Sequence, residues 1–244
     1  YLAANIKGFS GPLTAEKFSD GQSNPTYLLT AASGQYVLRR KPPGVLLPSA
    51  HAVDREYRVL TALEHTDVPV AQAYHLCEDD SIIGSMFYVM SFEAGNVFWD
   101  PSLPEFTQAE RGVIYQEIIR VMAAMHSVDL DKVGLADYGK PGNYFERQIS
   151  RWSKQYRASE TDEIPSMDKL IEWLVAHLPS DDSEACLIHG DYRLDNLMLH
   201  AKENRIIAVL DWELSTLGNP LADLAYFCMG LRLPKTAHSN GLAG

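Results

Sequence analysis

Three polar side chains in the last quarter of the chain have the types and spacing that a phosphoryl-transfer site needs. Asp191 and Asn196 lie five positions apart in the stretch HGDYRLDN (189–196), and Asp211 opens the triplet DWE. Each motif adjoins a short apolar run typical of a strand, at residues 197–199 and 206–210. In such sites an Asp orients the attacking hydroxyl, while an amide oxygen and a second carboxylate hold Mg²⁺ on a nucleotide. The pattern favours Asp191 as a catalytic residue and Asn196 and Asp211 as metal ligands. By itself it also fits turn residues that cap a hairpin.

Arg193 follows Asp191 by two positions and has two interpretations. Its guanidinium fork suits the oxygens of a transferred phosphoryl group, which would make it a second catalytic residue. The alternative is a structural ion pair with Asp195 or Asp223. We expect His126 and His189 to hold the loop through backbone hydrogen bonds, and Asp223 to brace it from the following helix.

Glu56 points to a nucleotide-binding region far upstream. At helical spacing it shares an apolar stripe with Ala52, Val59 and Leu63, and a carboxylate on such a stripe needs a partner. A cation at the end of strand 36–38 is the nearest candidate, with Arg39 and Arg40 both open. A helix Glu that holds a strand cation, which in turn holds phosphates, is the arrangement of kinases.

A turn before the first clear strand adds a weaker signal. Gly21, Ser23 and Asn24 are small or hydrogen-bonding residues, and the backbone N–H groups of such a turn can cover phosphates.

The elements that must position these residues fall into two groups. Apolar alternation predicts strands, turn residues predict a hairpin after the first of them, and the helical period predicts the helices. A capping box at Thr107 and Glu110 starts one helix. The expected order is strands 27–29 and 36–38, helix 50–64, strands 68–76 and 86–92, a connector at 91–95, and then helices from 107, at 143–158, 167–178 and 221–231. This order predicts an α+β fold, with a small antiparallel sheet and one helix followed by a mainly helical part.

The expected helix at 143–158 has two contrasting faces. Its aromatic and apolar face favours core contact. The opposite face is basic, and it is either a solvated surface or a landing surface for an anionic substrate. The apolar face comprises Phe145, Ile149, Trp152 and Tyr156, and the basic face comprises Arg147, Arg151, Lys154 and Arg157.

Composition excludes several function classes. The chain has 244 residues, 46% of them hydrophobic, and a net charge of −11, which disfavours nucleic-acid and membrane partners. Three scattered cysteines without metal spacing favour a reducing, cytoplasmic compartment. No G-x-G, G-K-[ST], H-E-x-x-H or G-x-S-x-G motif occurs, so dinucleotide, Walker A, zinc-protease and nucleophile-elbow sites are disfavoured.

Taken together, HGD…N (189–196), DWE (211–213) and GNP…DLA (218–225) resemble the aminoglycoside phosphotransferase family of the kinase-like superfamily. GQSNPT (21–26) and VLRRKPPG (37–44) are similar to the phosphotransferase-like domain related to that fused to acyl-CoA dehydrogenases. The resemblance implies a bilobal protein-kinase-like fold, with a nucleotide-binding lobe at 1–92 and a catalytic and substrate lobe at 93–244 that we expect to be truncated at its C-terminal end. It implies ATP and Mg²⁺ as cofactors, and adenine bonding to the connector backbone around Met90 and Phe92.

The chain departs from the superfamily at one position, because Arg39 stands where relatives usually have Lys. We expect an ATP- and Mg²⁺-dependent phosphotransferase acting on a hydroxyl of a small molecule, with a hydroxyacyl or other anionic compound as the acceptor. The alternative is a non-catalytic nucleotide- or acyl-CoA-binding module on the same fold.

Overall fold

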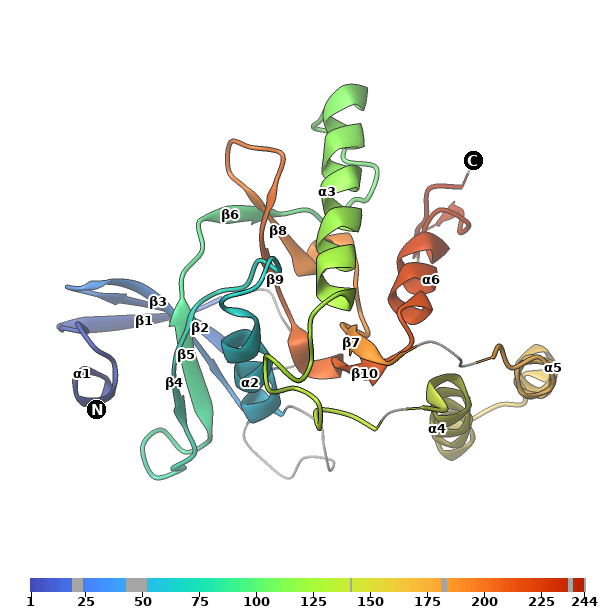
Figure 1. Ribbon diagram of the computed structural model, residues 1–244, viewed down its shortest axis with the longest axis horizontal. Helices are drawn as coiled ribbons and strands as arrows, with labels where there is room; N and C mark the ends of the chain where they lie inside the picture. Colours follow the sequence, from blue (N-terminus) through green and yellow to red (C-terminus); the bar gives the residue numbers. More distant parts are fainter. Residues whose placement is uncertain (19–23, 43–51, 141, 181–183, 237–238, 244) are drawn as a thin grey trace.

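A computed structural model describes residues 1–18, 24–42, 52–140, 142–180, 184–236 and 239–243 (Figure 1). The first part of the chain forms an antiparallel sheet of five strands in the order β1-β2-β3-β5-β4. Its elements are α1 (Leu2–Asn5), β1 (Leu13–Lys17), β2 (Thr26–Ala31), β3 (Gly34–Arg40), α2 (Val53–Leu63), β4 (Ala73–Cys77) and β5 (Phe87–Ser91). The hairpin expected from the sequence is the β2–β3 pair, and the two ends of the sheet are β1 and β4.

Helix α2 packs between this sheet and the rest of the molecule (Figure 1). Its buried positions are Val53, Glu56, Val59, Leu60 and Leu63, a spacing of three and four residues that places them on one face. The helix was expected at 50–64, of which residues 50 and 51 lie outside the described residues. The carboxylate of Glu56 is therefore buried, as its place on the apolar stripe predicts.

Strand β4 is shorter than expected. The apolar run from Val68 predicts a strand over 68–76, but β4 begins only at Ala73. Pro69 has no N–H to donate to a sheet ladder. Its carbonyl oxygen instead accepts the N–H of Val209 at 2.9 Å, so this segment connects the sheet to the C-terminal part of the chain.

In its described residues, the second part of the chain combines helices with three small sheets. β6, β8 and β9 form one sheet, β7 pairs with β10 in another, and β11 pairs with β12 in the third. Helix α3 starts with the expected capping box, in which Thr107 and Glu110 exchange hydrogen bonds. The elements are β6 (Gly95–Val97), α3 (Gln108–His126), α4 (Tyr144–Ser159), α5 (Pro165–Ala176), β7 (Cys186–Ile188), β8 (Leu197–His200), β9 (Ile206–Val209), β10 (Thr216–Gly218), α6 (Leu221–Met229), β11 (Lys235–Thr236) and β12 (Ser239–Asn240).

The connector expected at 91–95 is partly a strand. Gly95 opens β6, which pairs with β8. A Cβ at Gly95 would lie 2.5 Å from the carbonyl oxygen of Leu199, so the two strands approach this closely only because the residue is glycine. β6 has three residues and begins with a glycine, so it is too short for apolar alternation to indicate a strand.

The aromatic face of α4 does not join the core as expected. Trp152 is 56% exposed, and only Tyr144, at the first position of the helix, is buried. Among the described elements, α4 contacts mainly α5. The prediction of core contact is therefore wrong for Trp152. The amphipathic pattern was correct for helix formation, but it did not identify the surface that covers the helix.

One hydrophobic core runs through both parts of the chain. It includes Val59 and Leu63 of α2, Tyr88 of β5, Ile118 of α3 and Trp212, each at most 2% exposed. A smaller cluster around Phe87 and Val89 lies on the other face of the sheet, against α1. No helix among the described residues combines the length and the apolar character that a membrane crossing needs.

Candidate active site

The loop after β7 holds Asp191 and Asn196 side by side. Nδ2 of Asn196 donates to the main-chain oxygen of Asp191 at 2.8 Å and to its carboxylate Oδ2 at 2.9 Å. Because the amide nitrogen is turned toward Asp191, the Oδ1 of Asn196 is directed away from it, as a cation ligand requires. The N–H of Leu210 donates to the main-chain oxygen of Asn196 at 2.8 Å, which brings Asn196 beside the residue that precedes Asp211.

His189 fixes this loop through its backbone and ring. It is fully buried, and Nε2 lies 2.7 Å from the carbonyl oxygen of Leu210. Since a carbonyl can only accept, Nε2 carries the hydrogen, and Nδ1 accepts the N–H of Asp191 at 3.2 Å. The ring therefore connects the loop at 189–196 to the strand before Asp211, as expected for His189.

Asp223 braces the same loop from α6, as expected. Its two carboxylate oxygens accept the N–H groups of His189 at 2.8 Å and Gly190 at 2.9 Å, and Oδ2 lies 3.0 Å from Nε2 of His126. Asp223 is 1% exposed. A buried carboxylate with three partners holds the backbone ahead of Asp191 in one conformation.

In this structure Arg193 forms a structural ion pair, which was the second of the two roles expected for it. Its guanidinium forms a bidentate ion pair with Asp195, with Nη2 and Oδ2 2.5 Å apart. The sequence did not single out Tyr226 of α6, which adjoins the same group. Burial and a hydrogen bond to Asp191 raise the pKa of the Tyr226 phenol, while Arg193 lowers it. The Asp191 carboxylate therefore accepts from Asn196 and also lies near the Tyr226 phenol.

Arg39, and not Arg40, is the cation that meets Glu56. Nε of Arg39 lies 2.9 Å from Oε2 of Glu56, and its Nη2 lies 2.5 Å from Oδ1 of Asp211. Arg40, one register further, contacts the carbonyl oxygen of Lys41 instead. The alternation of side chains along β3 decides between the two, since Arg39 shares a face with Val37. The guanidinium thus joins β3 to α2 and to the segment after β9.

Glu56 is the buried centre of this network. Tyr88 donates its hydroxyl to Oε2 at 2.9 Å, and Asn24 donates Nδ2 to Oε1 at 2.8 Å. Burial raises the pKa of Glu56, and the charge of Arg39 opposes that rise. Burial alone would lower the pKa of Arg39, but Glu56 and Asp211 raise it overall.

Asn24, the last residue of the turn expected to cover phosphates, has its side chain in this buried network. It is 2% exposed, and its Nδ2 also lies 3.5 Å from Oε2 of Glu213. The side chain therefore connects the start of β2 to α2 and to the DWE triplet. Gly21 and Ser23, the other two residues of the expected turn, lie outside the described residues.

Three carboxylates converge beside Arg39. Glu56, Asp211 and Glu213 each place a carboxylate oxygen within 4.8 Å of the others. The Arg39 guanidinium contacts two of them, Glu56 and Asp211. Carboxylate oxygens are ligands that Mg²⁺ prefers, so the residues present fit the implied metal. The sequence offered Glu213 only as part of DWE, and no role was predicted for it.

Asp211 has an unusual backbone conformation. Its φ is 60° and its ψ is 62°, the left-handed region that residues other than glycine rarely adopt. Asp is among the better tolerated side chains there, and such strain concentrates at functional sites. The 3₁₀ turn η2 (Trp212–Leu214) follows directly. Trp212 anchors it, because its indole N–H donates to the carbonyl oxygen of Val209 at 3.0 Å.

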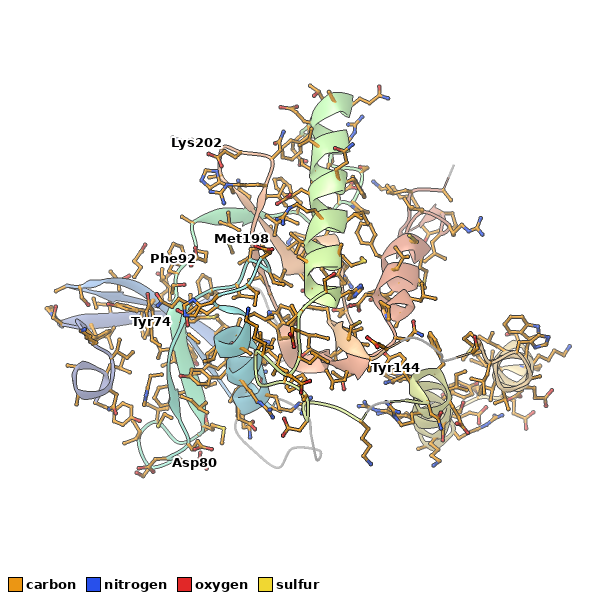
Figure 2. All side chains as sticks on the ribbon, in the orientation of Figure 1. Tyr74, Asp80, Phe92, Tyr144, Met198 and Lys202 are labelled. Atoms are coloured by element: carbon orange, nitrogen blue, oxygen red, sulfur yellow. The ribbon has the colours of Figure 1, made fainter. Side chains whose placement is uncertain are left out.

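Met90 and Phe92 lie where the first sheet ends. Met90 pairs with Val37 inside β5, and Phe92 follows the last residue of that strand (Figure 2). The segment then continues to β6, so the expected connector does run from the sheet to the second part of the chain.

Comparison with known proteins places the chain in a family. A sequence profile of the phosphotransferase enzyme family matches residues 14–240, and the chain belongs to that family. A crystal structure of a candidate aminoglycoside phosphotransferase from Ralstonia eutropha is 53% identical, with a TM-score of 0.90, and the match covers 100% of this chain and 71% of that one. The resemblance expected from the sequence motifs is confirmed.

More distant structures confirm the kinase-like α+β fold. The aminoglycoside phosphotransferase APH(4)-Ia, in a ternary complex with ADP and hygromycin B, is 18% identical with a TM-score of 0.63, over 90% of this chain and 72% of that one. A streptomycin–ATP complex of APH(2")-IIa is 16% identical with a TM-score of 0.64, over 89% and 72% of the two chains.

The curated relatives are much longer proteins. Acyl-CoA dehydrogenase family member 10 of Mus musculus is 50% identical over 227 residues, which cover 93% of this chain and 21% of the relative. Family member 11 of Rattus norvegicus is 47% identical over 240 residues, which cover 97% and 31%. The chain thus spans about a fifth to a third of the curated relatives that it matches.

Proposed function

We propose that the protein is an ATP- and Mg²⁺-dependent phosphotransferase that acts on a hydroxyl group of a small molecule. The observation that carries this proposal is the contact of Arg39 with both Glu56 and Asp211, next to the Asp191–Asn196 pair. These are the parts of a kinase site, one from the sheet, one from α2 and two from the loops after β7 and β9. In this proposal residues 1–92 form the nucleotide-binding lobe and residues 93–244 the catalytic and substrate lobe.

In the proposed reaction the acceptor oxygen attacks the γ-phosphorus of ATP and the bond to the β-phosphate oxygen breaks, which releases ADP. Asp191 accepts a hydrogen bond from the acceptor hydroxyl and takes up its proton. Tyr226 and Asn196 keep the Asp191 carboxylate in place. Asn196 and Asp211 would hold Mg²⁺, which would neutralise charge on the phosphates.

On the nucleotide side, Arg39 contacts the phosphates while Glu56 keeps its guanidinium oriented. Met90 and Phe92 offer backbone groups to the adenine, and Gly21, Ser23 and Asn24 belong to the phosphate-covering segment. Asn24 contributes by holding Glu56 and Glu213 rather than by direct contact. Arg193 contacts Asp195 through Nε and Nη2, so its Nη1 is the group that would meet a phosphoryl oxygen while this ion pair persists.

We propose a hydroxyacyl or other anionic compound as the acceptor. The support is the acyl-CoA dehydrogenase description of the curated relatives.

The test is phosphate transfer from ATP to a panel of hydroxylated metabolites, followed by ADP release. We expect Asp191→Asn to reduce kcat at least about 100-fold with little change in ATP affinity, because it removes the proton acceptor alone. Asp80→Asn is the matched control, since Asp80 is exposed in the β4–β5 turn at the far end of the sheet (Figure 2). Full activity in Asp191→Asn would contradict the role proposed for this residue.

A non-catalytic nucleotide- or acyl-CoA-binding module remains the second candidate. Arg39 in place of the usual Lys favours it, because a guanidinium differs in size and geometry from an ammonium. A thermal-shift comparison separates the two candidates. Stabilisation by ATP that requires Mg²⁺ supports the enzyme, whereas stabilisation by coenzyme A with no response to Mg²⁺–ATP supports the module.

A further inference from the structure

We propose that a groove along the first turns of α4 binds a small molecule carrying two or more phosphate groups. The residues that line this groove include none of those placed in the phosphoryl-transfer site, and the proposal does not depend on the proposed catalytic activity. The groove has a volume of about 940 Å³, within the range of small-molecule pockets. Four cations line it, and a single carboxylate, that of Glu146, faces them. The cations are Lys140, Arg147, Arg151 and Lys154.

The four cations lack an ion-pair partner in the part of the chain that the structure describes. Among the described residues, none of the four takes part in a salt bridge. Arg157, less than one turn beyond Lys154, behaves differently and contacts both Asp168 of α5 and Glu160. The chain has a net charge of −11, so acidic side chains are abundant. Within the described residues they neutralise Arg157 near the end of α4, while the cations near its beginning have no acidic partner.

The groove is attached firmly to the catalytic part of the fold. Arg147 donates Nη2 to the carbonyl oxygen of Lys140 at 2.7 Å, which links the helix to the preceding loop. Tyr144, at the start of α4, packs against Cys186 and Ile188 of β7 (Figure 2). Gly218 of β10 leaves room for its ring, since a Cβ there would lie 2.6 Å from the Tyr144 ring. The cations are therefore held beside the strand that leads to His189.

The charge and geometry of the lining define the ligand. Four cations and one carboxylate leave about three positive charges, and two phosphate groups carry about −3 to −4 at neutral pH. Two arginine forks match phosphate oxygens with paired N–H donors. The N-terminal end of α4 faces the same groove, and its helix dipole adds a further attraction for anions.

The test is calorimetric titration of the chain with inorganic pyrophosphate in buffer that contains EDTA. We expect Arg151→Glu to weaken binding at least about tenfold, because it reverses one of four converging charges. Lys202→Glu is the matched control. Lys202 is exposed on the β8–β9 turn, away from α4, and its substitution changes the net charge by the same amount (Figure 2). We expect binding in this control to stay within about twofold of the original.

A second variant separates the groove from the nucleotide site. Arg39→Met removes the cation of that site, and we expect pyrophosphate binding at the groove to be unchanged per folded molecule, with the folded fraction of the same sample measured by circular dichroism. Three results would overturn the proposal. They are absence of binding, equal weakening by Arg151→Glu and Lys202→Glu, and loss of all binding in Arg39→Met with no effect of Arg151→Glu.

Two further titrants test the ligand chemistry and its source. We expect glycerol 3-phosphate, with one phosphate, to bind at least about tenfold more weakly than pyrophosphate. Citrate binding as tight as that of pyrophosphate would overturn the assignment to phosphate. Titration with ADP tests whether the phosphates belong to a nucleotide. A second ADP site that Arg151→Glu weakens would identify the groove as a nucleotide site. Pyrophosphate binding without that second site assigns the groove to another phosphate ester.

Discussion

At the scale of single residues, the ion pairs of Arg39 connect segments that lie far apart in the sequence. Its side chain is 14% exposed, and that of Glu56 is 2% exposed. Two charges this deeply buried stabilise the fold only as a pair, because removal of one partner leaves the other without compensation. Glu56 also accepts from Asn24 and Tyr88, so its carboxylate cannot turn toward solvent without losing both hydrogen bonds.

We expect Arg39→Met to reduce the free energy of unfolding by about 3 to 5 kcal/mol near pH 8, and by less near pH 5.5. Burial already raises the pKa of Glu56, and loss of the Arg39 charge raises it further. A raised carboxyl pKa gives stability that is present below the unfolded-state pKa and is lost as pH rises through the folded-state pKa. The destabilisation therefore grows with pH, which urea unfolding at both values measures.

Arg40→Met is the control for this experiment, because Arg40 is the neighbouring arginine on the other face of β3. We expect it to cost less than about 1 kcal/mol at either pH. A loss in Arg39→Met that is the same at both pH values would show that Glu56 does not titrate in response to Arg39.

The sequence predicted the charged residues of this site, but it did not predict the residues that hold them in place. Helical spacing put Glu56 on the apolar stripe, and strand alternation put Arg39 on a defined face, since both patterns are local. Asn24 and Tyr226 were not predicted to hold the charged groups. Their contacts join residues 32 or more positions apart, and nothing in the neighbouring sequence reports such a distance.

At the scale of elements, the turn between β7 and Asp191 depends on the glycine that precedes the Asp. Gly190 has a φ of 81°, and a Cβ there would lie 2.7 Å from the carbonyl oxygen of Leu214. The loop is thus pressed against the η2 turn that follows Asp211. This contact aligns the two segments that carry Asp191 and Asp211.

We expect Gly190→Ala to destabilise the protein and to reduce any phosphotransferase activity more than its stability loss explains. Gly8→Ala is a matched control, because Gly8 has a φ of 83° but a Cβ there would meet no atom within 4 Å. Both variants bear the left-handed backbone cost of about 1 kcal/mol. Only Gly190→Ala adds a backbone clash, so urea unfolding of the two variants isolates the clash. Equal losses in the two variants would contradict the close approach.

The elements themselves were predicted well where the signal is local. The β2–β3 hairpin, the capping box of α3 and the helices α4 to α6 follow from turn residues and periodicity. β6 and β10 were missed because each has three residues and owes its place to a glycine, Gly95 or Gly218, at a close contact. The exposure of Trp152 was missed because an amphipathic pattern does not identify the surface that covers it.

At the scale of the whole molecule, helix α2 belongs to both parts of the chain. Arg55 donates to the carbonyl oxygens of Tyr138 at 3.0 Å and Ser215 at 3.3 Å, and its guanidinium lies 3.9 Å from the centre of the Tyr138 ring. The hydrophobic core is likewise continuous from α2 to Trp212. The division at residue 92 stays a prediction, and the hydrophobic core extends across that position.

A shared core predicts that the two lobes unfold together in one cooperative transition. Two local probes test this. Trp212 is buried, whereas the other three tryptophans, Trp99, Trp152 and Trp173, are between 55% and 61% exposed, so a change in tryptophan fluorescence reports chiefly on the core near Trp212. Cys77 of β4 is 2% exposed, and its reaction with a thiol reagent in a Cys186→Ser, Cys228→Ser background reports on the sheet.

We expect the two probes to give the same urea midpoint, and Arg55→Ala to lower both midpoints equally, because Arg55 connects α2 to the C-terminal lobe. The effect is about 1 to 3 kcal/mol, as expected for loss of a partly buried cation that serves two carbonyl groups and a ring. Arg111→Ala provides the comparison, since among the described residues the Arg111 guanidinium donates to Phe106, which lies five positions earlier in the chain. A Cys77 midpoint well below that of Trp212 would mean that the sheet opens independently. In that case the ion pair between Arg39 and Asp211 would break before the core unfolds. Nucleotide binding would then raise the Cys77 midpoint more than the Trp212 midpoint.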